Sequence, residues 1–214
     1  MPSASTEIWP SVPSTVFDGR MGEVVVVRHG QTEWSRSGQH TSVTDLPLLP
    51  EGEEQARNLR KSLAGRRFVD VWVSPRRRAL HTAELAGLTP TRVEEDLVEV
   101  DYGGYEGRTT LEIRAELGRP WTLWEDGTIP GDASPGETLA AVAVRVDRAL
   151  AQVKDRLADG DVALVAHGHV LRVLTARWLG LPPEAGALFA LPAGSYGVLG
   201  HDRERQVLTG WGLH

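Results

Sequence analysis

The chain has 214 residues, 41% of them apolar, which suits one globular α/β domain with its own core. Its net charge of −6 argues against a general nucleic-acid or anionic-membrane binder, and the absence of cysteine excludes disulfides and cysteine-based metal sites. No apolar run approaches the roughly 18 residues of a membrane helix. We therefore expect a cytoplasmic protein without a signal peptide, with a poorly ordered tail at 1–20 and one domain at 21–214.

Strand-like and helical segments alternate along most of the chain. The strand-like runs are short and rich in valine, and we place them at 24–27, 69–73, 91–94, 162–166, 196–199 and 206–209. Helical patterns with apolar residues every three or four positions cover 51–63, 138–157 and 169–179, and a further helix starts at the Ser74-Pro75 pair and runs to Leu85. Strands that are apolar on both faces and alternate with helices predict a three-layer α/β/α sandwich around a mainly parallel sheet.

The segment 101–135 lacks a clear period and is rich in glycine, tryptophan and proline. We expect it to form a lid-like insertion over the sheet. Tyr102, Trp121 and Trp124 all lie in this insertion and are candidates to line a substrate pocket. For the two tryptophans, stacking on a sugar face and packing within the lid remain alternatives.

Polar side chains follow the strands at the points where they end. Arg28 and His29 follow the first strand, arginines at 76–78 follow the second, and the HGH triplet at 167–169 follows the fourth. Ligands of open parallel sheets bind beyond the carboxyl ends of the strands, so these groups should share one rim with Glu99. Cations and helix N-termini hold a phosphoryl group, an imidazole attacks phosphorus, and a carboxyl group supplies a proton. The sequence therefore predicts chemistry on a small phosphorylated substrate.

Four motifs carry a family resemblance. They are RHGQTEW from Arg28, SPRRRALHTAE from Ser74, LVEVDYGGYEG from Leu97 and VAHGH from Val165. In order and spacing they resemble the histidine phosphatase superfamily, in the branch related to cofactor-dependent phosphoglycerate mutases. The resemblance covers residues 24–199 and implies a phosphoglycerate mutase-like α/β fold.

The resemblance also implies a role for each polar group. His29 is the expected nucleophile that becomes phosphohistidine, and Glu99 matches the proton donor. The expected ligands of the phosphoryl oxygens are Arg28, Arg78 and His167, with Ser35, Thr41, Ser42 and His169 as further candidates. Because positioned cations stabilise the transition state, this mechanism implies neither a metal nor a cofactor.

Two positions depart from the pattern of the family. Ser35 stands where the family usually has asparagine, and its hydroxyl can still donate to phosphate with a shorter reach. Ser42 replaces a usual glycine, and its backbone N–H is still expected to meet the phosphate.

The motifs favour a phosphatase over a mutase. Mutases that resemble this chain carry an arginine after the proton-donor glutamate, where this chain has Val100, and an arginine pair after a tryptophan in the insertion. Here Glu125 and Asp126 follow Trp124, and two acids in that place would repel the second anionic group of a phosphoglycerate. The segments GQTEWSRSGQHT and PWTLWEDG resemble the corresponding segments of sugar-phosphate phosphatases and of acid phosphatases with broad specificity. We therefore expect hydrolysis of small phosphomonoesters, with sugar phosphates and bisphosphates as substrates.

Two other classes of function remain as alternatives. A metal hydrolase could use His29, His167, His169 and Asp101 as ligands, and chelator sensitivity would reveal it. A binding module that holds a phospholigand in the same pocket would show no turnover. The sequence leaves monomer and homodimer open.

Overall fold

The valine run of β1 (Val24–Arg28) lies inside a six-stranded sheet of order β3-β2-β4-β1-β5-β6. The computed structural model describes residues 21–128 and 135–214, so the expected tail at 1–20 and residues 129–134 of the expected insertion lie outside it. The other strands are β2 (Phe68–Val73), β3 (Arg92–Val93), β4 (Asp161–Ala166), β5 (Tyr196–Asp202) and β6 (Arg205–Leu213). The first four strands are parallel, β5 pairs antiparallel with β1, and β6 pairs antiparallel with β5.

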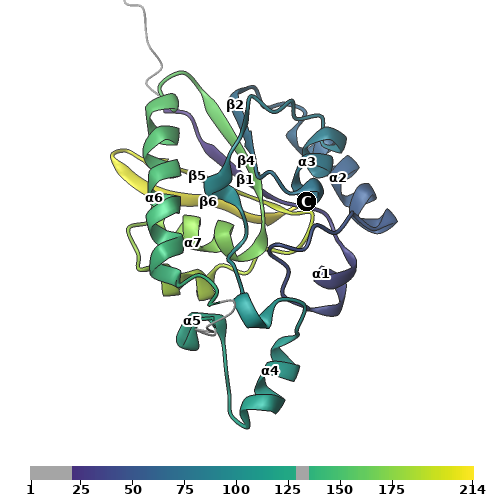
Figure 1. Cartoon of the computed structure of the whole chain (residues 1–214). Coiled ribbons are helices and arrows are strands. Elements are labelled where there is room, and N and C mark those ends of the chain that lie inside the picture. The colour runs from purple at the N-terminus through teal and green to yellow at the C-terminus, as the bar shows by residue number, and fades with distance from the viewer. Residues whose placement is uncertain (1–20, 129–134) are drawn as a thin grey trace, which may run out of the picture.

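Alternate valines of β1 enter two separate cores, one on each face of the sheet. Val24 and Val26 pack in the core of α6 (Leu139–Arg156) and α7 (Gly168–Trp178). Val25 and Val27 pack in the core of α2 (Pro50–Leu63) and α3 (Arg77–Leu85). Figure 1 shows the two helix pairs on opposite sides of the sheet, which confirms the predicted α/β/α sandwich. All four valines are fully buried, and each burial stabilises the fold by roughly 1.5 kcal/mol or more.

The remaining helices gather where the parallel strands end. They are α1 (Glu33–Ser37), α4 (Thr110–Leu117) and α5 (Leu123–Asp126), with short 3₁₀ segments at Glu95–Leu97, Gly103–Tyr105 and Pro183–Leu188. Figure 1 shows α1, α4 and α5 at the same end of the molecule, and α4 and α5 come from the segment expected to form a lid-like insertion. That it acts as a lid stays a prediction. None of the helices in 21–128 and 135–214 has the length and apolar character needed to cross a membrane.

The helix after β2 begins later than the sequence predicted. The prediction placed Ser74 as the cap and Pro75 as the first helical residue, but α3 begins at Arg77 with Arg76 at its N-cap. The hydroxyl of Ser74 lies instead 2.7 Å from Nε2 of His167. This buried contact holds residue 74 close to the end of β4, and the helix therefore starts beyond it.

The turn after β1 depends on two glycines in close contact. A Cβ on Gly30 would lie 2.2 Å from the carbonyl oxygen of Gly52, and a Cβ on Gly52 would lie 2.2 Å from that of Gln31. The N–H of Gly30 also donates to Oγ1 of Thr82 on α3, at 3.0 Å. The chain directly after His29 is thus held between α2 and α3 at a separation that only glycine allows.

Replacing Gly52 by alanine should therefore destabilise the protein. We expect Gly52→Ala to lower the free energy of unfolding by about 2 kcal/mol or more, because backbone must move to admit the methyl group. Urea denaturation measures this, with Gly65→Ala as the matched control, since a Cβ on Gly65 would meet no atom of the described residues within 4 Å. Equal stability of the two variants would contradict the tight contact.

Candidate active site

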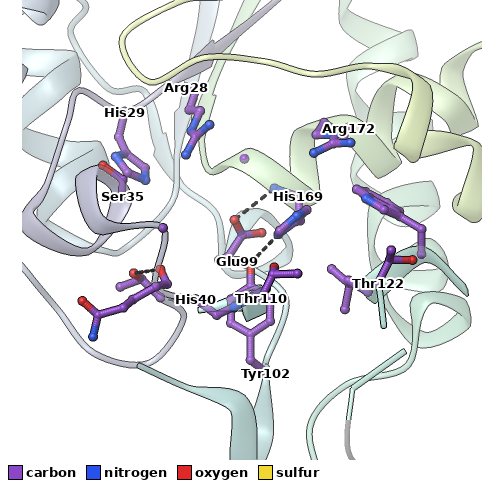
Figure 2. A pocket seen from close by; sticks show the side chains of 16 residues that line it. Arg28, His29, Ser35, His40, Glu99, Tyr102, Thr110, Thr122, His169 and Arg172 are labelled. Atoms are coloured by element: carbon purple, nitrogen blue, oxygen red, sulfur yellow. Dashed lines mark hydrogen bonds between the residues drawn. The ribbon is translucent and has the colours of Figure 1, made fainter. Parts of the chain in front are cut away.

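A cavity of about 320 Å³ opens where β1 and β4 end, and sixteen residues line it (Figure 2). The residues predicted from the sequence that line it are Arg28, His29, Ser35, Thr41, Glu99, Tyr102, Trp124 and His169. The predicted residues that do not line it are Ser42, Arg78, Trp121 and His167. Segments far apart in the sequence thus line the same cavity, as expected for groups at the ends of neighbouring parallel strands.

His29 presents one ring nitrogen to this cavity. Its Nδ1 lies 2.7 Å from the carbonyl oxygen of Gly30, and because a carbonyl only accepts, Nδ1 carries the hydrogen. Burial, together with the charges of Arg78 and Arg28, holds the pKa of His29 well below its ordinary value. The imidazole is therefore neutral at neutral pH, and the lone pair of Nε2 is free to act as a nucleophile.

Arg28 lies beside His29 with hydrogen-bonding capacity to spare. Its NH1 donates to the carbonyl of Leu191 at 2.6 Å, and its guanidinium carbon would lie 3.2 Å from a Cβ on Gly168. Its Nε is buried without a hydrogen-bond partner among the described residues. An unpaired buried donor on a cation is costly unless a ligand pairs with it, and an anion does so best.

Glu99 is held by the first turn of α7. Its Oε1 accepts the N–H groups of Val100 at 3.0 Å and Val170 at 2.8 Å, and its Oε2 accepts that of His169 at 3.0 Å. Both lone pairs of Oε1 are therefore occupied, whereas Oε2 keeps one. Figure 2 shows this carboxyl group and the His29 imidazole bordering the same space. Oε2 is thus the atom placed to exchange a proton with a bound molecule.

Arg78 and His167 form a buried layer behind His29. The rings of His29 and His167 meet edge to face at 5.2 Å, and Nε of Arg78 donates to Nδ1 of His167 at 3.1 Å. The other donors of Arg78 reach backbone carbonyls in the 41–44 segment. Burial and the Arg78 charge hold the pKa of His167 well below its ordinary value. These contacts position the imidazole and the loop, while a direct grip on phosphoryl oxygens stays a prediction for both residues.

The hydroxyl-bearing candidates are hydrogen-bonded within the chain. Ser35 forms a capping box with Thr32 at the start of α1, and Thr41 Oγ1 donates to a carbonyl two residues earlier. The N–H of Ser42, expected to meet the phosphate, donates to both carboxylate oxygens of Glu106 at 2.9 and 3.0 Å. Contact between a ligand and this N–H would require the Glu106 carboxylate to move.

Of the three aromatic candidates, two line the cavity and one is buried in the core. The hydroxyl of Tyr102 lies 2.6 Å from Nδ1 of His169, and both side chains line the cavity with Trp124. Trp121 is 2% exposed, packs against Tyr105 at 4.9 Å between ring centroids, and does not line the cavity. Of the two alternatives left open for the tryptophans, the structure thus places Trp121 in the packing of the insertion.

Two charged or titratable residues of the wall were not predicted from the sequence. Arg172 follows His169 by three positions on α7, and such spacing places both side chains on one helix face, which could have revealed it. His40 also lines the cavity, and its Nδ1 lies 2.6 Å from the carbonyl of Arg108. Its position depends on that long-range contact, which no local pattern signals.

The two acids expected to repel a second anion lie elsewhere. Asp126 accepts the N–H of Thr122 and pairs with Arg119, and Glu125 accepts the Thr122 hydroxyl, both on the exposed side of α5. Neither carboxylate lines the cavity. The predicted repulsion is therefore wrong, because α5 turns its acids to solvent and Trp124 towards the cavity.

The alternative metal site finds little support in these contacts. Asp101 Oδ1 accepts the N–H of Gly103 and does not line the cavity. Both ring nitrogens of His167 are engaged by protein groups. Across 21–128 and 135–214, no three imidazole or carboxylate side chains are grouped as metal ligands would be.

Comparisons with known proteins show which proteins the chain is similar to. A model of the histidine phosphatase superfamily (branch 1) matches residues 24–214. The chain is 40% identical to an acid phosphatase of Mycobacterium tuberculosis over 91% of this chain and 94% of the relative. It is 38% identical to the sedoheptulose 1,7-bisphosphatase of Saccharomyces cerevisiae, over 73% of this chain and 67% of the relative. A solved M. tuberculosis open-reading-frame structure superimposes with a TM-score of 0.84 at 38% identity, covering 90% of this chain and 97% of the other.

The buried neutral imidazoles predict that acid destabilises the fold. In the unfolded chain a histidine takes up a proton below a pH of about 6.5, whereas the lowered pKa values of His29 and His167 keep both rings neutral when folded. The unfolded state therefore binds more protons, and the free energy of unfolding falls as the pH drops from about 6.5, by up to ~1.4 kcal/mol per pH unit for each ring.

Urea denaturation between about pH 7 and 5.5 checks this expectation. The double variant His29→Gln, His167→Gln should show a shallower loss of stability with acid than the parent protein, because it lacks both titrating groups. Identical slopes for the two proteins would show that these rings are not the source of the acid sensitivity.

Proposed function

The chain belongs to branch 1 of the histidine phosphatase superfamily and is a phosphatase of phosphomonoesters, and we propose that it works without a metal, through a phosphohistidine on His29. One observation carries this proposal above the others. The bond between Nδ1 of His29 and the Gly30 carbonyl leaves Nε2 for the substrate, beside Nε of Arg28, which has no hydrogen-bond partner within 21–128 and 135–214.

The first step of the reaction transfers the phosphoryl group to the protein. The lone pair of His29 Nε2 forms a bond to phosphorus while the bond to the ester oxygen breaks in line with it. Oε2 of Glu99 donates a proton to that oxygen, which leaves as an alcohol. Arg28 neutralises the charge that spreads over the equatorial oxygens, and Nδ1 keeps its hydrogen, which it donates to the Gly30 carbonyl throughout.

The second step releases phosphate. Glu99, now a carboxylate, takes a proton from a water that attacks phosphorus, and the bond to Nε2 breaks with its electron pair returning to the nitrogen. The leaving group is then a neutral imidazole, which the low pKa of His29 favours. Protons and charges are thereby restored to their starting places.

We propose sugar phosphates and sugar bisphosphates as the substrate class. The cavity combines a phosphate end at Arg28 with aromatic rings at Tyr102, Trp124 and His169, and such rings suit the apolar face of a sugar. The relatives include a sedoheptulose 1,7-bisphosphatase and a glucosyl-3-phosphoglycerate phosphatase, the second 33% identical over 77% of each chain. Val100, where related mutases carry an arginine, is fully buried, which supports hydrolysis over mutase activity.

Hydrolysis of two esters with different leaving groups tests the proposal. With a chelator present, the protein should release phosphate from p-nitrophenyl phosphate and from glycerol 3-phosphate. His29→Ala should lower kcat/KM on both about a thousandfold or more, because the nucleophile is gone. Glu99→Gln should lower kcat/KM about a hundredfold more on glycerol 3-phosphate, because p-nitrophenolate leaves without a proton and an alkoxide does not.

The matched control is His81→Ala, an imidazole on α3 that does not line the cavity. It should retain the parent activity on both esters. Activity that survives in His29→Ala, or that the chelator abolishes, would overturn the mechanism. Equal losses on both esters in Glu99→Gln would remove Glu99 from the role of proton donor.

A further inference from the structure

The proposed steps of the reaction leave three polar side chains of the cavity wall unused. They are His40, Tyr102 and His169. Figure 2 shows the first two beyond Glu99 as seen from Arg28. Because Glu99 is the proposed proton donor to the ester oxygen, the leaving group of the substrate extends towards these rings. Building on the proposed function, we propose that His40 and His169 bind hydroxyl groups of the leaving group and thereby select esters of polyols.

His169 presents a hydrogen-bond donor to the cavity. The hydroxyl of Tyr102 lies 2.6 Å from Nδ1 of His169 and has no other partner within 21–128 and 135–214. Tyr102 is 2% exposed, and burial together with the charge of Glu99 raises the pKa of its phenol well above the ordinary value, so the phenol keeps its proton. A buried hydroxyl donates to an acceptor within reach, so Nδ1 of His169 accepts this hydrogen. Burial lowers the pKa of His169, and the single hydrogen of the neutral ring is then on Nε2.

His40 presents a hydrogen-bond acceptor. Its Nδ1 lies 2.6 Å from the carbonyl oxygen of Arg108, and because a carbonyl only accepts, Nδ1 carries the hydrogen. Burial lowers the pKa of His40, which favours the neutral ring and leaves a lone pair on Nε2. In the described part of the chain, Nε2 of His40 and Nε2 of His169 have no hydrogen-bond partner, and neither nitrogen is buried. Both therefore reach the open space of the cavity.

The two rings together match a hydroxyl better than an anion. They lie nearly parallel, with 12° between their planes and 6.1 Å between their centroids. A hydroxyl oxygen that bonds to both nitrogens at about 2.8 Å holds them roughly 4.6 Å apart, which this spacing admits, and adjacent hydroxyls of a polyol can divide the two bonds. A hydroxyl accepts from Nε2 of His169 and donates to Nε2 of His40, whereas a carboxylate has no hydrogen to donate.

Both rings are held in place by protein contacts. The ring of His40 meets that of Tyr102 edge to face at 4.8 Å, and the ring of His169 meets that of Trp124 in the same way at 5.2 Å. The backbone N–H of His169 also donates to Glu99 at 3.0 Å. Because the two imidazoles are already ordered, binding a hydroxyl costs little further conformational entropy.

Esters that differ only in their hydroxyl groups test this inference. The pairs are glycerol 3-phosphate with propyl phosphate and sorbitol 6-phosphate with hexyl phosphate, and every member carries one phosphate. In the parent protein, we expect kcat/KM to favour the polyol member of at least one pair by about tenfold or more. His40→Asn and His169→Asn should each bring that ratio close to one. Asparagine keeps a polar atom for the partner of Nδ1, which is Arg108 or Tyr102, and removes Nε2.

Two further variants sharpen this test. His40→Gln places an amide oxygen near the position of Nε2 and should retain part of the ratio, which a purely structural role of the ring does not predict. His81→Asn is the matched control, because it removes an imidazole on α3 that does not line the cavity. It should keep the ratio of the parent protein, and circular dichroism checks that all variants fold.

NMR of the parent protein reads the tautomers without turnover. Long-range proton–nitrogen correlations should show the hydrogen of His40 on Nδ1 and that of His169 on Nε2. A hydrogen on Nδ1 of His169 would overturn the inference, because the cavity would then offer no imidazole donor.

Three kinetic outcomes also overturn it. They are a parent ratio near one in both pairs, a ratio that stays unchanged in either asparagine variant, and equal losses on both members of each pair. If the parent protein hydrolyses none of these esters, the proposed function fails, and calorimetric binding to His29→Ala decides separately. Tighter binding of glycerol 3-phosphate than of propyl phosphate, lost on adding His40→Asn, supports the hydroxyl site, and equal binding overturns it.

Discussion

The hydrogen bond from His29 Nδ1 to the Gly30 carbonyl is the contact on which the site depends. It fixes which nitrogen carries the hydrogen and so which one faces the cavity. The chain on either side of this bond is closely packed: four buried valines hold β1, and Gly30 packs against Gly52 and donates to α3. Burial then keeps the imidazole neutral. A dry core thus sets the direction of the imidazole that we propose as the nucleophile before substrate binds.

A second constraint is the start of α7, which organises the rest of the cavity. Its first turn gives two N–H groups to Glu99, and Gly168 allows Arg28 to lie across the helix end. The next turn carries Arg172. One helix thereby holds the proposed proton donor, Glu99, and packs against the proposed phosphate-binding cation, Arg28. Neighbouring groups on a rigid element hold their geometry better than groups on loops.

The sequence predicted the layers, the parallel strands and the residues at their tips, because apolar periodicity and strand-end position are local signals. It failed where a side chain's direction depends on distant contacts. The hydroxyl of Ser74 contacts His167 instead of capping α3, and the N–H of Ser42 donates to the carboxylate of Glu106. The acids of α5 face solvent, and Arg172, which the sequence did not point to, lines the cavity. Orientation within an insertion follows from tertiary packing, which one sequence does not display.

The most direct test of the account is the position of phosphate on the protein during turnover. The enzyme is mixed with p-nitrophenyl phosphate, quenched in alkali within the first turnovers, and examined by peptide mass spectrometry and phosphorus NMR. The account predicts phosphate on His29, bonded to Nε2, because Nδ1 is tied to the Gly30 carbonyl. Phosphate on Nδ1, on another residue, or on no residue while p-nitrophenol accumulates would contradict it.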